Sequence, residues 1–88
     1  MSGMPQAYTI VMKRIADGGL ARQTYEGLCE VWEQAGRPTT NIWYWRWTGV
    51  AEELLDAARE VQAAGYALLA ASLLDRHHDA VQKAAECR

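Results

Sequence analysis

The stretch "NIWYWRWTG", residues 41–49, decides the fold, because it is compatible with a helix or a strand. It holds three of the chain's four tryptophans and one of its four tyrosines. If a helix runs from Asn41 to about Ala64, one face collects Trp43, Trp47, Val50, Ala51, Leu54, Ala58 and Val61 at helical spacing. This stripe predicts a core helix, which Thr40 or Asn41 can cap.

Two large apolar residues, Ile42 and Trp45, fall on the opposite side of that helix, next to Arg46 and an acidic face. Trp, Tyr and Arg are enriched at the energetic centres of protein interfaces. We therefore expect a partner-binding surface, with cover by the N-terminal segment as the alternative for Trp45. The expected contact residues are Ile42, Tyr44, Trp45, Arg46, Glu52, Glu53 and Asp56.

The same stretch is also rich in β-formers. In a strand, Trp43, Trp45 and Trp47 would share one face. Residues 8–15 would have to supply the neighbouring strand, and a two-stranded sheet is marginal on its own. A small α+β domain with a short element at 8–15 and 42–48 is therefore the alternative to an all-α fold.

Three further helices are expected, over 5–17, 20–36 and 66–86, separated by glycine or proline at positions 18–19, 36–38 and 65. One long bent helix over 41–85 is the alternative. The chain of 88 residues predicts one all-α domain, a bundle of about four helices that dimerisation could complete, with frayed ends at 1–5 and 86–88. In the helix over 20–36, the expected apolar stripe consists of Ala21, Tyr25, Leu28, Trp32 and Ala35, with Leu20 and Val31 beside it. In the helix over 66–86, the expected apolar stripe consists of Leu69, Leu73, Ala80 and Val81, and it is widened by Leu68, Leu74, Ala84 and His77.

Composition narrows the class of protein. The formal net charge of −2 lacks the basic excess that binding a phosphate backbone requires, although Lys13, Arg14, Arg22, Arg37 and Arg46 could form a local nucleic-acid contact. The two cysteines are 58 positions apart and form no disulfide framework. The opening "MSGMPQ" lacks the pattern of a signal peptide, and no apolar run is long enough to span a membrane. We expect a cytoplasmic protein.

Catalytic and metal-binding patterns are weak. Adjacent His77 and His78 point about 100° apart on a helix and cannot chelate one metal together. Asp75 and His78 form at most half of a site, and no Glu-x-x-His motif occurs. Neither cysteine has a cationic environment that would activate its thiol. We therefore expect neither enzyme activity nor a cofactor or metal.

The function expected from these features is non-enzymatic protein binding. The chain would act as a small inhibitor or regulator, of the antitoxin-like, immunity-like or bacterial or phage regulator kind, whose aromatic side chains occlude a partner's surface. A homodimer is expected as well. A structural homo-oligomer and a nucleic-acid-contacting transcriptional regulator are the alternatives.

Overall fold

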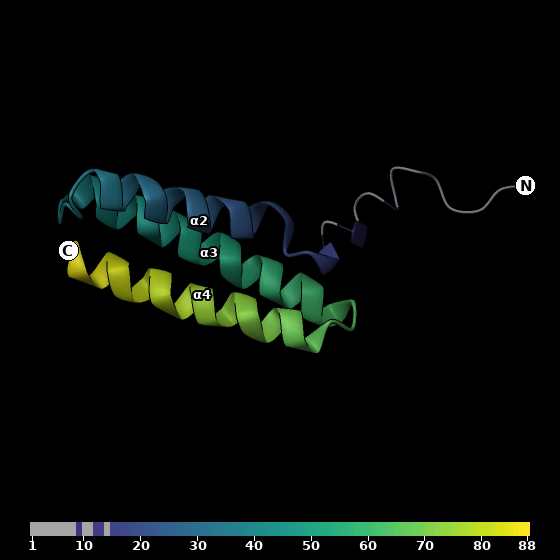
Figure 1. Ribbon diagram of the computed structural model, residues 1–88. Helices are drawn as coiled ribbons and strands as arrows, with labels where there is room; N and C mark the ends of the chain where they lie inside the picture. The colour runs from purple at the N-terminus through teal and green to yellow at the C-terminus, as the bar shows by residue number, and fades with distance from the viewer. Residues whose placement is uncertain (1–8, 10–11, 14) are drawn as a thin grey trace, which may run out of the picture.

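In the computed structural model, which describes residues 9, 12–13 and 15–88, the chain forms three helices. They are α2 (Gly19–Gln34), α3 (Asn41–Ala63) and α4 (Ala67–Glu86) (Figure 1). The all-α prediction is confirmed, and the described residues include no strand. Residues 42–48 are helical, so the α+β alternative is wrong for this segment.

The predicted helix over 5–17 lies largely outside the described residues. Those that are described between 9 and 16, namely Thr9, Met12, Lys13, Ile15 and Ala16, are helical, which gives no support to a strand at 8–15. Ile15 packs against the core. Three complete helices are therefore established for the described part of the chain, and the expected fourth helix is not confirmed.

Helices α3 and α4 form an antiparallel hairpin, and α2 packs on it mainly through α3 (Figure 1). The predicted core face of α3 is confirmed in full, since its buried residues are Trp43, Trp47, Val50, Ala51, Leu54, Ala58 and Val61. Small residues on α4, among them Ala70, Ala80 and Ala84, are also buried. Alanine at these positions lets the two helix backbones approach closely.

The turn between α3 and α4 excludes one continuous helix over 41–85. Gly65 has a left-handed φ of 95° just after the last turn of α3. The amide of Tyr66 donates to the carbonyl of Val61 at 3.1 Å, and the amide of Gly65 donates to Gln62 at 2.9 Å. This Schellman arrangement ends the helix and reverses the chain. Gly36 and Arg37 end α2 in the same way, with the Arg37 amide 2.9 Å from the carbonyl of Trp32.

Several residues expected in the apolar stripes are on the surface instead. Leu68 is 90% exposed, and Leu20, Val31 and Val81 are exposed as well. On α4 the buried positions are Ala70, Leu73, Ala80 and Ala84, so Leu68 and Val81, at the edges of the expected stripe, are left at the surface. The chain end differs too: Cys87, expected in a frayed tail, is buried, and its thiol donates to the carbonyl of Pro38 (S···O 3.6 Å).

The carbonyl of Pro38 also accepts the indole N–H of Trp32 at 2.9 Å. The loop between α2 and α3 is thus attached to α2 and to the end of α4, which sets the position at which α3 begins. Within the described residues, none of the helices combines the length and the apolar character needed to cross a membrane.

Candidate interaction surface

The first turns of α3 carry Ile42 and Trp45, the two large apolar side chains that helical spacing places away from the predicted core face. Ile42 is 64% exposed and Trp45 is 68% exposed. Both lie on the side of the helix opposite Trp47, which is fully buried. The predicted exposure of Ile42 and Trp45 is therefore confirmed. Most of the N-terminal segment, which was the alternative cover for Trp45, lies outside the described residues.

Neighbouring side chains hold this surface in place. The ring of Tyr44 meets Trp45 edge-on, with centroids 5.0 Å apart. The guanidinium of Arg46 lies 5.1 Å from the ring centroid of Trp43, a cation–π contact. We call Ile42, Tyr44, Trp45 and Arg46 the aromatic patch. Because it stands on one well-formed helix anchored by buried Trp43 and Trp47, its side chains are presented on a rigid base.

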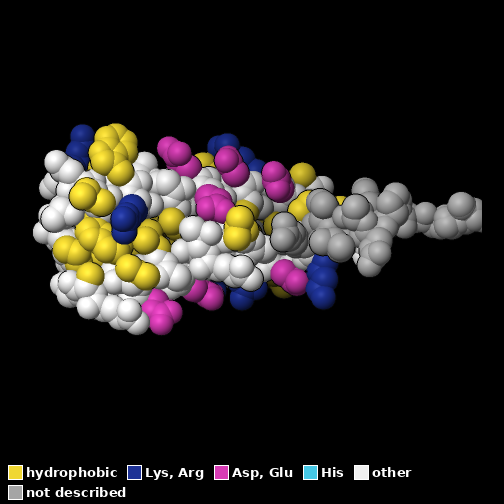
Figure 2. All heavy atoms as spheres, turned by 90° about the horizontal axis from the view of Figure 1, so that it is seen from above, with side chains coloured by type: hydrophobic (Ala, Val, Ile, Leu, Met, Phe, Trp, Pro, Cys, Tyr) yellow, Lys and Arg dark blue, Asp and Glu magenta, His cyan; other side chains and the backbone are white. Residues whose placement is uncertain are grey.

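Figure 2 shows hydrophobic side chains gathered at the end of the molecule where α2 finishes and α3 begins, with a basic side chain among them and acidic side chains further along. Val31, near the end of α2, is half exposed and adds to the apolar surface of this end. The apolar character is thus concentrated at one end rather than scattered, as expected for a contact surface.

The acidic residues predicted to extend this surface do not stay together. Glu52 lines a groove between α3 and α4, along with Tyr44. Glu53 and Asp56 line a different groove, between α3 and the start of α2, near Gly19. Of the seven predicted contact residues, the structure brings Ile42, Tyr44, Trp45 and Arg46 into one patch and divides the three acidic residues between its two sides.

The groove between α3 and α4, which we call the α3–α4 groove, lies on the side of the hairpin away from α2 and has a volume of about 300 Å³. Its lining is mainly apolar, with Leu55 and Val81 on facing helices over the small side chains of Ala51 and Ala84. Val81 was expected in the core and is 46% exposed here. His77 reaches across the groove, its Nδ1 2.7 Å from the carbonyl oxygen of Ala51.

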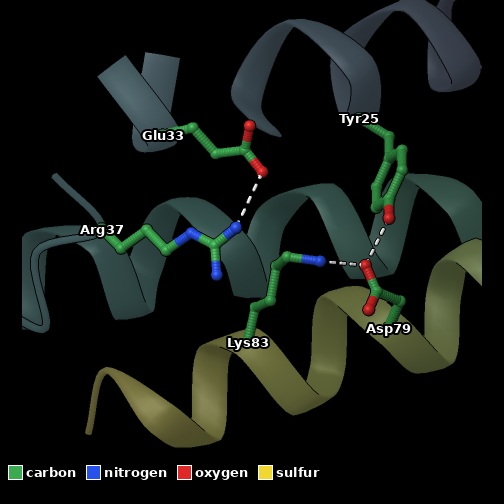
Figure 3. Close-up of polar contacts among 5 residues, drawn as sticks. All are labelled: Tyr25, Glu33, Arg37, Asp79 and Lys83. Carbon is green, nitrogen blue, oxygen red and sulfur yellow. Dashed lines mark hydrogen bonds and ion pairs between the residues drawn. The ribbon is translucent and has the colours of Figure 1, made fainter. Parts of the chain in front are cut away.

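On the other side of the hairpin, polar contacts hold α2 to α4 (Figure 3). The hydroxyl of Tyr25 and the ammonium of Lys83 both donate to the carboxylate of Asp79. Burial opposes ionisation of Asp79, but these two donors outweigh it and lower the pKa of the carboxyl. Burial, followed by the hydrogen bond to Asp79, raises the pKa of Tyr25 far above its ordinary value. We regard this cluster as structural, because it joins two helices and Lys83 also lies 5.4 Å from the ring of buried Trp47.

The structure also places the candidate metal ligands and the two thiols. Among the described residues, no three His, Cys, Asp or Glu side chains come together as a metal site would require, and Asp75 and His78 gain no third ligand. Burial raises the pKa of both thiols, Cys29 and Cys87, which makes them less reactive at neutral pH.

The basic residues do not form one stripe either. Lys13 and Arg22 line a hollow at the start of α2 that also contains Asp17 and Glu26. Arg37, at the other end of α2, pairs with Glu33 at 3.1 Å (Figure 3). Arg14 lies outside the described residues.

No protein-family model matches the chain, and the comparisons with curated proteins and with solved structures returned no significant match. Inference about function therefore depends on the geometry of the surfaces described above.

Proposed function

We propose that the protein works by binding another protein through the aromatic patch, as a small regulator or inhibitor that occludes part of its partner's surface. The observation that carries this proposal is the pair of apolar side chains, Ile42 and Trp45, each more than 60% exposed on the same face of a rigid helix. Leaving such side chains in water forgoes the free energy that their burial would provide.

The residue types in the aromatic patch also support a role in protein binding. A tryptophan supported by a tyrosine and flanked by an arginine has the side chains that most often dominate binding energy. Because Trp45 is already packed against Tyr44, it loses less conformational freedom on binding than an unsupported side chain would. Asp56, further along the same helix, is exposed and would favour a partner whose rim is basic.

The test is capture of partners by the immobilised protein from an extract of the source cell, followed by measurement of affinity with the purified partner. Trp45→Ser should weaken binding by at least about 2 kcal/mol, which is roughly 30-fold in Kd. The matched control is Leu68→Ser, which also removes an exposed apolar side chain but stands at the start of α4, beside the far end of α3 and about 27 Å from Trp45 along that helix.

The control should bind as the parent does, and both variants should keep the parent's helical circular dichroism. A partner that binds both variants equally well would rule out the aromatic patch as its contact site. An unfolded Trp45→Ser variant would show that Trp45 supports the fold.

A further inference from the structure

The α3–α4 groove is a second surface, which adjoins the aromatic patch at Tyr44 and continues along the hairpin. On α4, Val81 and Ala85 line the groove, and helical spacing places Leu74 and His78 on the same face. On α3, Thr48, Glu52 and Leu55 line it, and the same spacing adds Arg59. We call these eight residues the hairpin face: Thr48, Glu52, Leu55, Arg59, Leu74, His78, Val81 and Ala85.

Helix α2 does not cover this face. Its contacts with α4 are made through the opposite side of that helix, where Arg76 pairs with Glu26 at 3.7 Å and Asp79 accepts from Tyr25. Val81 is 46% exposed, and Leu55 and Leu74 are half-buried. The hairpin thus has α2 on one side and an open, partly apolar face on the other.

We infer that this face binds a second copy of the chain, with the two hairpins packed face to face and antiparallel about a two-fold axis beside Leu55. Charge complementarity between the two copies supports this pairing. In such a pair, residues at equal distances before and after the axis face each other. With the axis level with the midpoint between Leu55 and Asp56, Glu52 and Arg59 stand at equal distances on either side of it, so each Glu52 lies opposite the partner copy's arginine.

Neither residue has an ion-pair partner within its own described chain. The two-fold axis therefore supplies two identical ion pairs, one at each side of a central contact between the two Leu55 side chains. In a face-to-face pair with parallel helices, the two-fold axis runs along the hairpin and α3 packs on the partner copy's α4, so Glu52 and Arg59 do not meet. The two ion pairs therefore form only in the antiparallel arrangement.

The size of the face fits a weak dimer. Residues 48–62 of α3 span about 22 Å, and two helices side by side are about 20 Å wide, so the face covers roughly 450 Å² on each copy. The total is near the lower limit of about 1,000 Å² for a specific interface. The resulting four-helix arrangement would bury Val81 and Leu55 and leave Ile42 and Arg46, on the other side of α3, free for a different partner.

The first experiment is light scattering behind size exclusion, with sedimentation equilibrium, over a wide range of protein concentrations. The parent should change from monomer to dimer with rising concentration, and Val81→Arg should remain monomeric. Val31→Arg is the matched control, because Val31 is exposed to a similar extent, 50%, but lies on α2. It should dimerise as the parent does.

A charge exchange tests the antiparallel register. Glu52→Arg and Arg59→Glu should each weaken the dimer roughly five- to tenfold, because each change turns two attractive pairs into repulsive ones. The double variant should recover the parent's dimer constant to within about twofold, because the pairs are restored with their signs exchanged.

A parent that stays monomeric at the highest concentration reached would overturn the inference. So would a dimer that Val81→Arg and the charge exchange leave unchanged. A dimer that only Trp45→Ser dissociates would place self-association on the aromatic patch, against both this inference and the proposed function. Failure to find a foreign partner, with the hairpin-face dimer confirmed, would leave the inference standing and remove the proposed function.

Discussion

Trp45 and Trp47 are two positions apart in α3, yet one is 68% exposed and the other is fully buried. Two positions on a helix correspond to a rotation of about 200°, so adjacent odd-numbered residues point to nearly opposite sides. In a strand the two would have shared a face. The different environments of these two tryptophans follow directly from the helical conformation of the stretch.

Tyr25 is the residue at which we expect a distinctive dependence of stability on pH. Burial and the hydrogen bond to Asp79 raise its pKa in the folded state above the ordinary value. Such a group contributes stability that is fully present below the unfolded pKa of about 10 and is lost as pH rises beyond it. The free energy of unfolding should therefore fall above about pH 10.

Urea unfolding of Tyr25→Phe across neutral and alkaline pH checks this expectation. The variant should lose about 1 kcal/mol at neutral pH, for the missing hydrogen bond, and should show a shallower decline at alkaline pH. Tyr66→Phe, at a tyrosine that is 43% exposed, should follow the parent's profile. An alkaline decline that is identical in Tyr25→Phe and the parent would show that Tyr25 is not its source.

At the scale of the helices, glycine has opposite consequences at two positions. Gly65 adopts a left-handed φ of 95° at the end of α3, where a side chain is strained. Gly49 lies inside α3, and apart from its chain neighbours and the helix's own backbone no atom lies within 4 Å of where a Cβ would stand. Gly65→Ala should therefore destabilise the fold by about 1–2 kcal/mol, and Gly49→Ala should stabilise it by about 1 kcal/mol.

Chemical denaturation of the two variants measures both effects against the parent. The signs matter more than the magnitudes, because each substitution adds the same methyl group. A Gly49→Ala variant that is less stable than the parent would show that the exposed side of α3 is more crowded than the structure indicates.

The helices differ in how well their faces could be predicted. Every residue of the predicted core face of α3 is buried, because its large apolar side chains lie on one side and its charges on the other. In α4, Val81 and Leu68 were placed with the core and are exposed. Alanine is frequent on several sides of α4, so its apolar pattern does not define a single direction. The alanines that face α3 are therefore set by how α4 packs on α3 and not by the apolar pattern of α4 itself.

At the scale of the whole molecule, Trp47 joins the three helices into one core. From α2, the rings of Trp32 and Tyr25 meet it edge-on at 5.5 Å and 6.1 Å, and from α4 the ammonium of Lys83 lies 5.4 Å from its ring. Trp47→Ala should cost about 3–5 kcal/mol, a large share of the stability of a domain of this size.

Thermal and urea unfolding of Trp47→Ala and Trp45→Ala provide the comparison. The loss of stability in Trp47→Ala should appear as one cooperative unfolding transition at a lower urea concentration than in the parent, because all three helices share the core. Trp45→Ala should change stability by no more than about 0.5 kcal/mol, as substitutions at exposed positions usually do. Comparable losses in both variants would mean that Trp45 also belongs to the core.

The sequence by itself favoured the all-α class over an α+β alternative, located the ends of α2 and the start of α3, and assigned the two sides of α3, including the exposure of Ile42 and Trp45. These properties are local: glycine and proline interrupt helices where they stand, and the helical period assigns each side chain of one helix to a direction. They could be predicted without knowledge of any neighbouring helix.

Only the tertiary structure decided which neighbour lies along each direction. It placed Glu52 on the side of α4 and Glu53 and Asp56 on the side of α2, buried Cys87 against Pro38, and left Val81 beside an open groove. These outcomes depend on the rotation of each helix about its axis and on the side from which α2 packs. Such choices are settled by contacts between residues far apart in the chain, which the spacing within a single helix does not encode.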